Sequence, residues 1–210
     1  MKFKKRYILI FILLSILIYY SIEIIYARSH TIDTANKYLS NIKITKQELT
    51  KRQLEIFLKI QDPNFYNHRG VDFKTPGSGW TTITQSLAKK FYFKNFKQGL
   101  PKIKQTLCAR FALDPLVSKD NQITLFINMM YFGNKQYGIV DSSEYYFSEK
   151  VWDLNDDEFI SLIACLISPV TLNIKDNPEG NLERVNRIKK MLSGEYKPKG
   201  LLDITYDKGP

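Results

Sequence analysis

Residues 60–73 read IQDPNFYNHRGVDF, and in this stretch a helical sequence pattern gives way to a long irregular one. Before it, Thr50 and Gln53 have the spacing of a capping box, and apolar residues follow at helical spacing. From residue 62 to residue 80 the chain holds two prolines, three glycines and no steady apolar period. That composition is typical of a long functional loop. We therefore expect a helix that ends near Gln61 and a loop that carries chemistry.

Helical patterns resume after this loop and continue almost to the C-terminus. Proline disfavours helix in the residue before it, so Asp114-Pro115 should end one of these helices. Ser118 and Asn155 are suited to cap the helices that follow them. Strand signals are weak, and the sequence predicts a mainly α fold. The helices expected here cover residues 81–91, 102–113, the segment after Ser118, 159–167 and 182–192.

The N-terminal segment is apolar and long enough to cross a membrane. Residues 7–27 are almost all apolar, and about 20 residues in a helix span a hydrocarbon layer of about 30 Å. Basic residues precede the apolar run, which favours an orientation with the folded part outside the cytoplasm. The exit from the run lacks a small-x-small cleavage site, so an uncleaved anchor is favoured over a cleaved signal peptide or a buried core helix. The basic residues are Lys2, Lys4, Lys5 and Arg6.

The charge of the chain indicates an anionic partner other than nucleic acid. The formal net charge is +10, and the first 27 residues account for +3 of it, which leaves +7 on the remainder. Excess lysine and arginine beside a membrane favour lipid head groups or a phosphate-bearing substrate. Between residues 88 and 104, lysines alternate with aromatic residues, as in segments that lie at a membrane interface. An orientation away from the cytoplasm argues against nucleic acid.

The two cysteines, Cys108 and Cys165, lie in apolar, helix-like surroundings. We expect small core residues there, although a disulfide stays open outside the cytoplasm. With only His30 and His68 as histidines, the chain has no zinc-ligand pattern.

Three segments resemble, in order and spacing, the peptidoglycan glycosyltransferases of glycosyltransferase family 51. In residues 60–73 the family pattern Glu-Asp-x-x-Phe-x-x-His-x-Gly is kept at Asp62, Phe65, His68 and Gly70. Residues 79–90, GWTTITQSLAKK, are similar to Gly-Gly-Ser-Thr-Ile-Thr-Gln-Gln-Leu-x-Lys-Asn.

Residues 101–133 form the third segment, which is similar to Arg-Lys-x-x-Glu followed by Ser-Lys-Asp-Glu-Ile-Leu-Glu-x-Tyr-Leu-Asn. The resemblance covers about residues 54–191, and Trp80 and Thr81 depart from the second motif. It identifies the chain as a divergent monofunctional member of the family.

The resemblance implies a lysozyme-like helical domain behind a single transmembrane helix. It also implies the activity, which is to join the disaccharide of lipid II to a growing glycan strand and to release undecaprenyl pyrophosphate. Lysines that hold phosphates are implied at Lys89, Lys102 and Lys119. The full set of substrate-binding positions that it implies is His68, Thr82, Thr84, Gln85, Lys89, Lys102, Lys119 and Asn128.

The catalytic positions implied by the resemblance are Gln61, Asp62 and Gln105. Gln61 stands where the family has its catalytic glutamate, and Gln105 and Thr124 stand at further glutamate positions. A glutamine amide does not take up a proton at ordinary pH, and loss of general-base help costs about 10²–10⁴ in rate. Asp62 is either a substitute base or a carboxylate that braces the loop.

Two functions therefore stand as hypotheses: a glycosyltransferase with a relocated base, or a non-catalytic module that binds a lipid-linked glycan or a cell-wall synthesis partner. The two glutamine substitutions favour the second. A divalent cation stays open as a cofactor, and no residue is assigned as a metal ligand. The expected location is the inner or plasma membrane, with the domain on the periplasmic side.

We expect residues 1–27 to form the cytoplasmic tip and anchor, 28–49 a connector, 50–194 the glycosyltransferase-like domain and 195–210 a loosely ordered tail. A penicillin-binding domain is not expected after residue 194.

Overall fold

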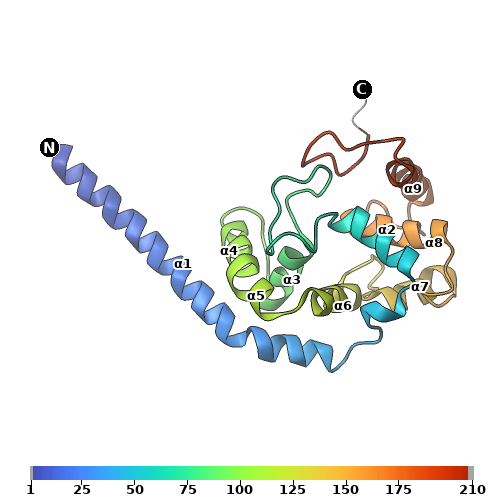
Figure 1. Cartoon of the computed structure of the whole chain (residues 1–210), viewed down its shortest axis with the longest axis horizontal. Helices are drawn as coiled ribbons and strands as arrows, with labels where there is room; N and C mark the ends of the chain where they lie inside the picture. The colour runs from blue at the N-terminus through green and yellow to red at the C-terminus, as the bar shows by residue number, and fades with distance from the viewer. Residues whose placement is uncertain (1, 208–210) are drawn as a thin grey trace.

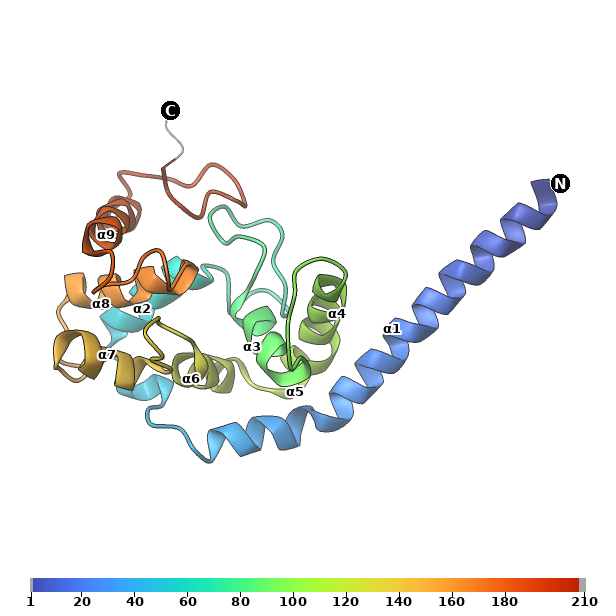
Figure 2. The same cartoon turned by 180° about the vertical axis from the view of Figure 1, so that it is seen from behind.

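In the computed structural model, which describes residues 2–207, a long N-terminal helix extends away from a helical domain (Figures 1 and 2). Side chains are described from Lys5 onward. Lys2 and Lys4 are two of the basic residues that favour the orientation predicted for the helix, and their side chains lie outside the described part. Helix α1 (Lys2–Leu39) has 38 residues. Its apolar part reaches a mean hydropathy of 2.6 and has no buried residues, so its length and composition suffice to cross a membrane.

The second half of α1 belongs to the folded domain. Ala27, Thr31 and Ala35 are buried at four-residue intervals, which places them on one helix face. The hydroxyl groups of Thr31 and Tyr92 are hydrogen bonded at 2.8 Å. The expected connector 28–49 is therefore helical as far as Leu39 and packs against the domain, because this face of the helix finds apolar partners there.

The other helices surround a single apolar core. Within residues 2–207 no β-strand is present, and the isolated bridge between Tyr131 and Tyr137 is the one β-type pairing. The mainly α fold behind an apolar N-terminal helix is confirmed. The helices after α1 are η1 (Lys46–Glu48), α2 (Lys51–Gln61), α3 (Ile83–Tyr92), α4 (Pro101–Cys108), η2 (Ala109–Leu113), α5 (Asp114–Leu116), α6 (Lys119–Met129), α7 (Ile139–Phe147), α8 (Asp156–Ala164), η3 (Cys165–Ile167) and α9 (Pro178–Ser193).

The predicted helix starts agree with the structure where a side chain caps the helix. Thr50 and Gln53 form a reciprocal capping box at the start of α2. Ser118 accepts the Asn121 N–H at the start of α6, and Asn155 forms a capping box with Glu158 at α8.

The predicted helix end at Asp114-Pro115 is wrong. The chain continues from α4 through the π-helix η2 into α5, which ends at Leu116. A π turn is wider than an α turn, and the Asp114 N–H reaches back five residues to the Ala109 carbonyl. Pro115 follows as the second residue of α5.

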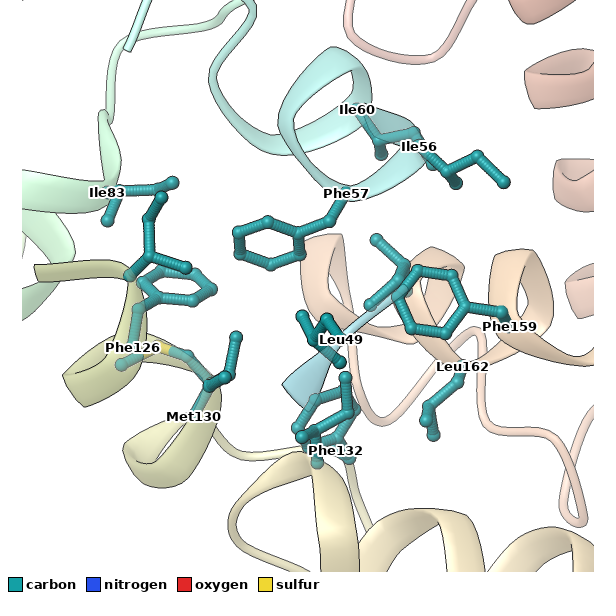
Figure 3. Close-up of a cluster of buried hydrophobic side chains, with 14 of the residues drawn as sticks. Leu49, Ile56, Phe57, Ile60, Ile83, Phe126, Met130, Phe132, Phe159 and Leu162 are labelled. Atoms are coloured by element: carbon teal, nitrogen blue, oxygen red, sulfur yellow. The ribbon is translucent and has the colours of Figure 1, made fainter. Parts of the chain in front are cut away.

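The core lies between α2, α6 and α8. Figure 3 shows Phe57, Phe126 and Phe159 together with aliphatic side chains of α2 and α8. The Phe57 and Phe126 rings meet edge to face with centroids 5.6 Å apart. Because α2 is held from both sides, Gln61 at its C-terminal end has a fixed position.

Both cysteines are buried and free. Cys108 packs with Ala27 and Ala112 where α1 meets the domain. Burial raises the pKa of Cys108 to about 11 and that of Cys165 to about 12.

The C-terminal segment is packed rather than loosely ordered in its described part, residues 195–207. The backbone N–H groups of Gly77 and Gly79 donate to the carbonyls of Gly200 and Leu201 at 2.9 and 2.8 Å. Tyr206 is buried. Figures 1 and 2 both show this segment beside the loop between α2 and α3. These contacts use backbone groups, so the side-chain sequence gives little sign of them; residues 208–210 lie outside the described part.

Candidate functional site

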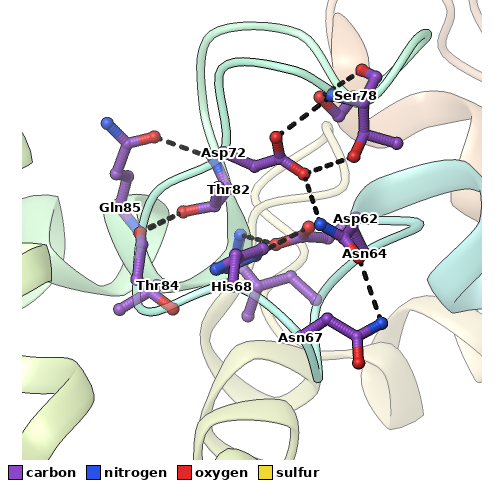
Figure 4. Close-up of polar contacts among 12 residues, drawn as sticks. Asp62, Asn64, Asn67, His68, Asp72, Ser78, Thr82, Thr84 and Gln85 are labelled. Carbon is purple, nitrogen blue, oxygen red and sulfur yellow. Dashed lines mark hydrogen bonds and ion pairs between the residues drawn. The ribbon is translucent and has the colours of Figure 1, made fainter.

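Asp62 and His68 brace the loop between α2 and α3. The Asp62 carboxylate meets the His68 Nε2 at 2.9 and 3.0 Å and accepts the Ile83 N–H at 3.0 Å (Figure 4). Asp62 is 0% exposed. Its charge lies at the first residue of α3, where an anion is favoured by the unpaired N–H groups of a helix start. The geometry therefore favours the loop-bracing role of Asp62 over that of a base.

The same loop passes close to η2 at Gly70. A Cβ added there would lie 2.7 Å from the Ala109 carbonyl oxygen, and the φ angle of +82° suits glycine. The motif residue Gly70 thus lets the loop backbone lie against the helix.

The threonines and Gln85 of the second motif fix the start of α3. Thr82 donates to the Gly70 carbonyl at 2.8 Å and accepts the Gln85 N–H at 3.1 Å. Thr84 donates to the Gln122 side chain at 2.6 Å, and Gln85 donates to Thr106 at 3.0 Å. Figure 4 shows the contacts between Thr82 and Gln85 at this helix start. Thr82, Thr84 and Gln85 are buried, and their substrate-binding role stays a prediction.

Gln61 lies where two cavities meet. The first, which we call the lysine cavity, has a volume of about 640 Å³, and the second, the arginine cavity, has about 390 Å³. Both are lined by Gln61, Ser86, Lys89 and Leu166. The remaining lining of the lysine cavity is Lys90, Phe93, Lys94, Phe96, Phe126, Met130, Tyr131 and Pro169.

The arginine cavity is formed by the loop, α8, α9 and the C-terminal segment. Its polar lining includes Thr81, Gln98 and Arg184, and Trp80 stands at its edge with 54% of its surface exposed. The remaining lining is Ile60, Gly77, Ser78, Gly79, Ile163, Ala164, Ile167, Leu202 and Ile204.

Lysines give a positive charge to the two cavities, which together we call the cleft. Burial, and then the neighbouring Lys90, lowers the pKa of Lys89. Burial, and then Lys89, lowers the pKa of Lys102 to about 8. The Lys102 amine donates to Thr81 Oγ1 at 2.9 Å, and Thr81 lines the arginine cavity. Partly buried amines that repel one another favour a polyanion between them, because an anion offsets both costs.

The other predicted site residues lie away from the two cavities. Gln105 is 0% exposed and donates to the Gln85 carbonyl at 2.6 Å. Lys119 forms an ion pair with Asp114 at 2.7 Å and lies over the Phe65 ring. These contacts hold helices together, so the roles predicted for Gln105 and Lys119 are not supported by their position.

Asn128 joins α6 to the segment that follows α1. Its side chain accepts the Lys43 N–H at 2.8 Å and donates to the carbonyls of Ile44 and Thr124 at 2.7 Å. With every polar atom of its amide engaged, Asn128 has a structural position.

Sequence reasoning missed Ser86, Lys90, Lys94 and Arg184 as cleft residues. The spacing of Ser86, Lys89 and Lys90 along α3 was a usable signal, because residues three or four apart share a helix face. No sequence signal indicated Arg184 as a cleft residue, because α9 is far from the motifs in sequence.

The cleft lacks carboxylates. Among the described residues, neither cavity is lined by aspartate or glutamate, and no group of three His, Cys, Asp or Glu side chains is placed to hold a metal ion. Hard divalent cations bind through carboxylate oxygens. The lining therefore does not fit a protein-bound divalent cation, and we assign no step to one.

Comparison with known proteins shows the family to which the chain belongs. The Transglycosylase family profile matches residues 28–193, which include the C-terminal part of α1, residues 28–39. Penicillin-binding protein 1F of Bacillus subtilis (strain 168) is 32% identical over 191 residues, which cover 82% of this chain and 27% of that protein. Penicillin-binding protein 1A of Vibrio cholerae is 30% identical over 177 residues, which cover 77% of this chain and 21% of that protein.

For penicillin-binding protein 1A of Escherichia coli (strain K12), the identity is 28% over 145 residues, 63% of this chain and 17% of that protein. The chain thus spans about a quarter or less of the length of these relatives. Since the profile covers most of the chain, from α1 to the last residue of α9, the chain belongs to the Transglycosylase family.

Proposed function

We propose that this domain binds lipid II or a related undecaprenyl-linked glycan in the cleft that the two cavities form, and that it polymerises glycan slowly or not at all. The observation that carries the proposal is the lining of the cleft, which is rich in lysine and free of carboxylates at the described positions. Binding a pyrophosphate needs cations, whereas activating a sugar hydroxyl needs a base.

The cations are suitably placed for a pyrophosphate. Lys89 lines both cavities, and Lys90 and Lys94 line the lysine cavity. Apolar and aromatic side chains, among them Phe93 and Phe96, share that lining. A pyrophosphate joined to an apolar chain matches a cavity that offers amines beside aromatic rings.

The base is missing at the position where it is expected. Gln61 reaches the junction of the cavities but carries a neutral amide. Asp62, the next residue, is fully buried and bound to His68 and the Ile83 N–H, so it does not face the cleft. The hypothesis of a relocated base at Asp62 finds no support in this geometry.

The proposed setting follows from the helix α1. With its apolar part in the inner or plasma membrane and the basic tip on the cytoplasmic side, the cleft lies on the periplasmic side, close to a lipid-linked ligand. A non-polymerising member of this family would act by holding such a ligand or a cell-wall synthesis partner.

The test uses the detergent-solubilised full chain and labelled lipid II, with Gln61→Glu as the decisive variant. We expect the native chain to bind lipid II and Gln61→Glu to raise the polymerisation rate by about 10²–10⁴. Lys89→Gln should weaken binding in both backgrounds. Gln105 is left unchanged because a carboxylate there would be buried.

A native chain that polymerises as fast as the Gln61→Glu variant would refute the proposal. So would a native chain that shows no lipid II binding.

A further inference from the structure

The lysine cavity gathers amines whose charge is not balanced by a carboxylate. Its lining includes Lys89, Lys90 and Lys94. Within the described part of the chain none of these three lysines forms an ion pair, whereas Lys46 and Lys119 are each paired with an aspartate. After burial, the charge of Lys90 is the second cause that lowers the pKa of Lys89. Like charges beside one cavity repel one another until an anion lies between them.

Lys90 is a cation that departs from the resembled motif. The motif that residues 79–90 resemble ends in Lys-Asn, and Lys89 and Lys90 stand at these two positions. A neutral amide at position 90 would leave the lysine cavity with one cation fewer. The charge of this cavity is therefore higher than the motif alone requires.

The Lys90 amine is held at one wall of the cavity by aromatic contacts. It lies over the Tyr137 ring, 5.3 Å from the ring centroid. The Tyr137 and Tyr131 ring centroids are 5.0 Å apart, and Tyr131 lines the lysine cavity. The Lys89 amine lies over the Phe96 ring in the same way, at 5.6 Å. Aromatic rings restrict the two amines without neutralising them, so both charges stay available to a ligand.

The ester state of a lipid-linked pyrophosphate decides how many charges it brings to such a cavity. In a lipid-linked sugar both phosphates are esterified. A free polyprenyl pyrophosphate ends in a phosphate monoester, whose second ionisation has a pKa of about 6, so it carries one further negative charge near neutral pH. Several cations beside one cavity stabilise the more highly charged end group more strongly, because each added charge pair contributes.

We propose that the lysine cavity prefers the terminal pyrophosphate of a free polyprenyl pyrophosphate over the esterified pyrophosphate of a lipid-linked sugar, and that Lys90 sets this preference. This inference rests on the proposed function and deepens it, because it names the end group that the cavity selects. The domain then holds the lipid that glycan polymerisation releases more tightly than the lipid that polymerisation consumes.

The experiment compares two ligands that differ by one charge: farnesyl pyrophosphate, and the same compound with a methyl ester on its terminal phosphate. Each is titrated by calorimetry into the full-length protein in a non-ionic detergent near neutral pH, and the heat measured with protein-free micelles is subtracted. We expect the free pyrophosphate to bind about fivefold more tightly, the effect of one added charge pair at a partly exposed site. Equal affinities would overturn the inference, and this comparison needs no change in the protein.

Variants then assign the preference to Lys90. Lys90→Asn, which restores the motif residue, should reduce the preference to about twofold or less, and Lys90→Arg should keep it. Lys150→Asn is the matched control, because Lys150 also lies over an aromatic ring, that of Trp152, but lines neither cavity. A preference that is unchanged in Lys90→Asn, or that falls equally in Lys150→Asn, is incompatible with the inference.

The proposed function is read separately, by binding of lipid II to the same preparation. Lipid II binding without any preference between the two farnesyl ligands refutes only the inference. A preference for the free pyrophosphate in a chain that does not bind lipid II refutes only the proposed function.

Discussion

Replacing Asp62 by alanine should destabilise the fold rather than remove a reacting group. The change removes the acceptor of the Ile83 N–H and of the His68 ring, both of which are buried. Each group left unpaired costs about 1–3 kcal/mol, and breaking a buried charged contact typically costs about 3–5 kcal/mol in total. We expect the free energy of unfolding to fall by about 4 kcal/mol, in the middle of that range.

Urea unfolding of the full chain in mild detergent, followed by tryptophan fluorescence, measures this loss. With a slope of about 2 kcal/mol per molar urea, the midpoint should fall by about 2 M. Asp62→Asn keeps an acceptor oxygen and should lose about half as much. Gln61→Ala is the control, because the Gln61 side chain is half-buried and makes no hydrogen bond within the described part of the chain, so its removal should change stability by about 0.5 kcal/mol or less. An Asp62→Ala protein that unfolds at the native midpoint, yet loses a polymerising activity present in the native chain, would refute the reasoning.

Two further predictions concern backbone packing and charge. Gly133→Ala should destabilise the fold by about 2 kcal/mol or more, because the new Cβ would lie 2.3 Å from Asn173 Nδ2 and φ is +91°; Gly200→Ala, with no heavy atom within 4 Å, is the control for the change in unfolding midpoint. If both variants unfold at the same urea concentration, the close approach at Gly133 is not a constraint. Lys102 has a pKa of about 8, so a fraction of its amines is neutral at pH 8.5, and binding inorganic pyrophosphate should take up protons there. Calorimetry in buffers of different ionisation enthalpy measures that uptake, and a Lys102→Arg protein with undiminished uptake would assign it to another group.

Much of the helical framework was predictable because its starts are set locally. The caps at Thr50, Ser118 and Asn155 use side chains that bond to the backbone N–H three residues further on, and all three are confirmed. Helix α7 was missed because Gly138 precedes it with a φ of +79° and no side-chain cap, so the usual signal is absent.

Features that depend on distant contacts were not predictable. The helix end at Pro115 was misplaced because a π turn cannot be told from an α turn by apolar spacing. The packing of the C-terminal segment leaves no sequence signal, because its bonds to Gly77 and Gly79 involve backbone atoms, which every residue carries.

The candidate site shows the same division. Motif resemblance drew attention to Gln61 and Lys89, which line the cleft, and equally to Thr82 and Asn128, which hold the loop and the segment after α1 in place. A motif does not separate the residues of a cleft from those that support it, and Arg184 became visible only when α9 was placed beside the loop.

The continuity of α1 has a mechanical consequence. Helix α1 continues from its apolar part into the domain without a flexible linker. Residues 27–39 extend for about 20 Å, with Ala27, Thr31 and Ala35 buried against the domain. With the apolar part of the helix in a bilayer, the height and tilt of the cleft above that bilayer are set by the helix, and spinning about the membrane normal is the motion left at little cost. A ligand that diffuses laterally in the same leaflet then meets the cleft at one depth, so the search is two-dimensional. Each residue added to the helix between the membrane and the domain would rotate the cleft by about 100° around the helix axis.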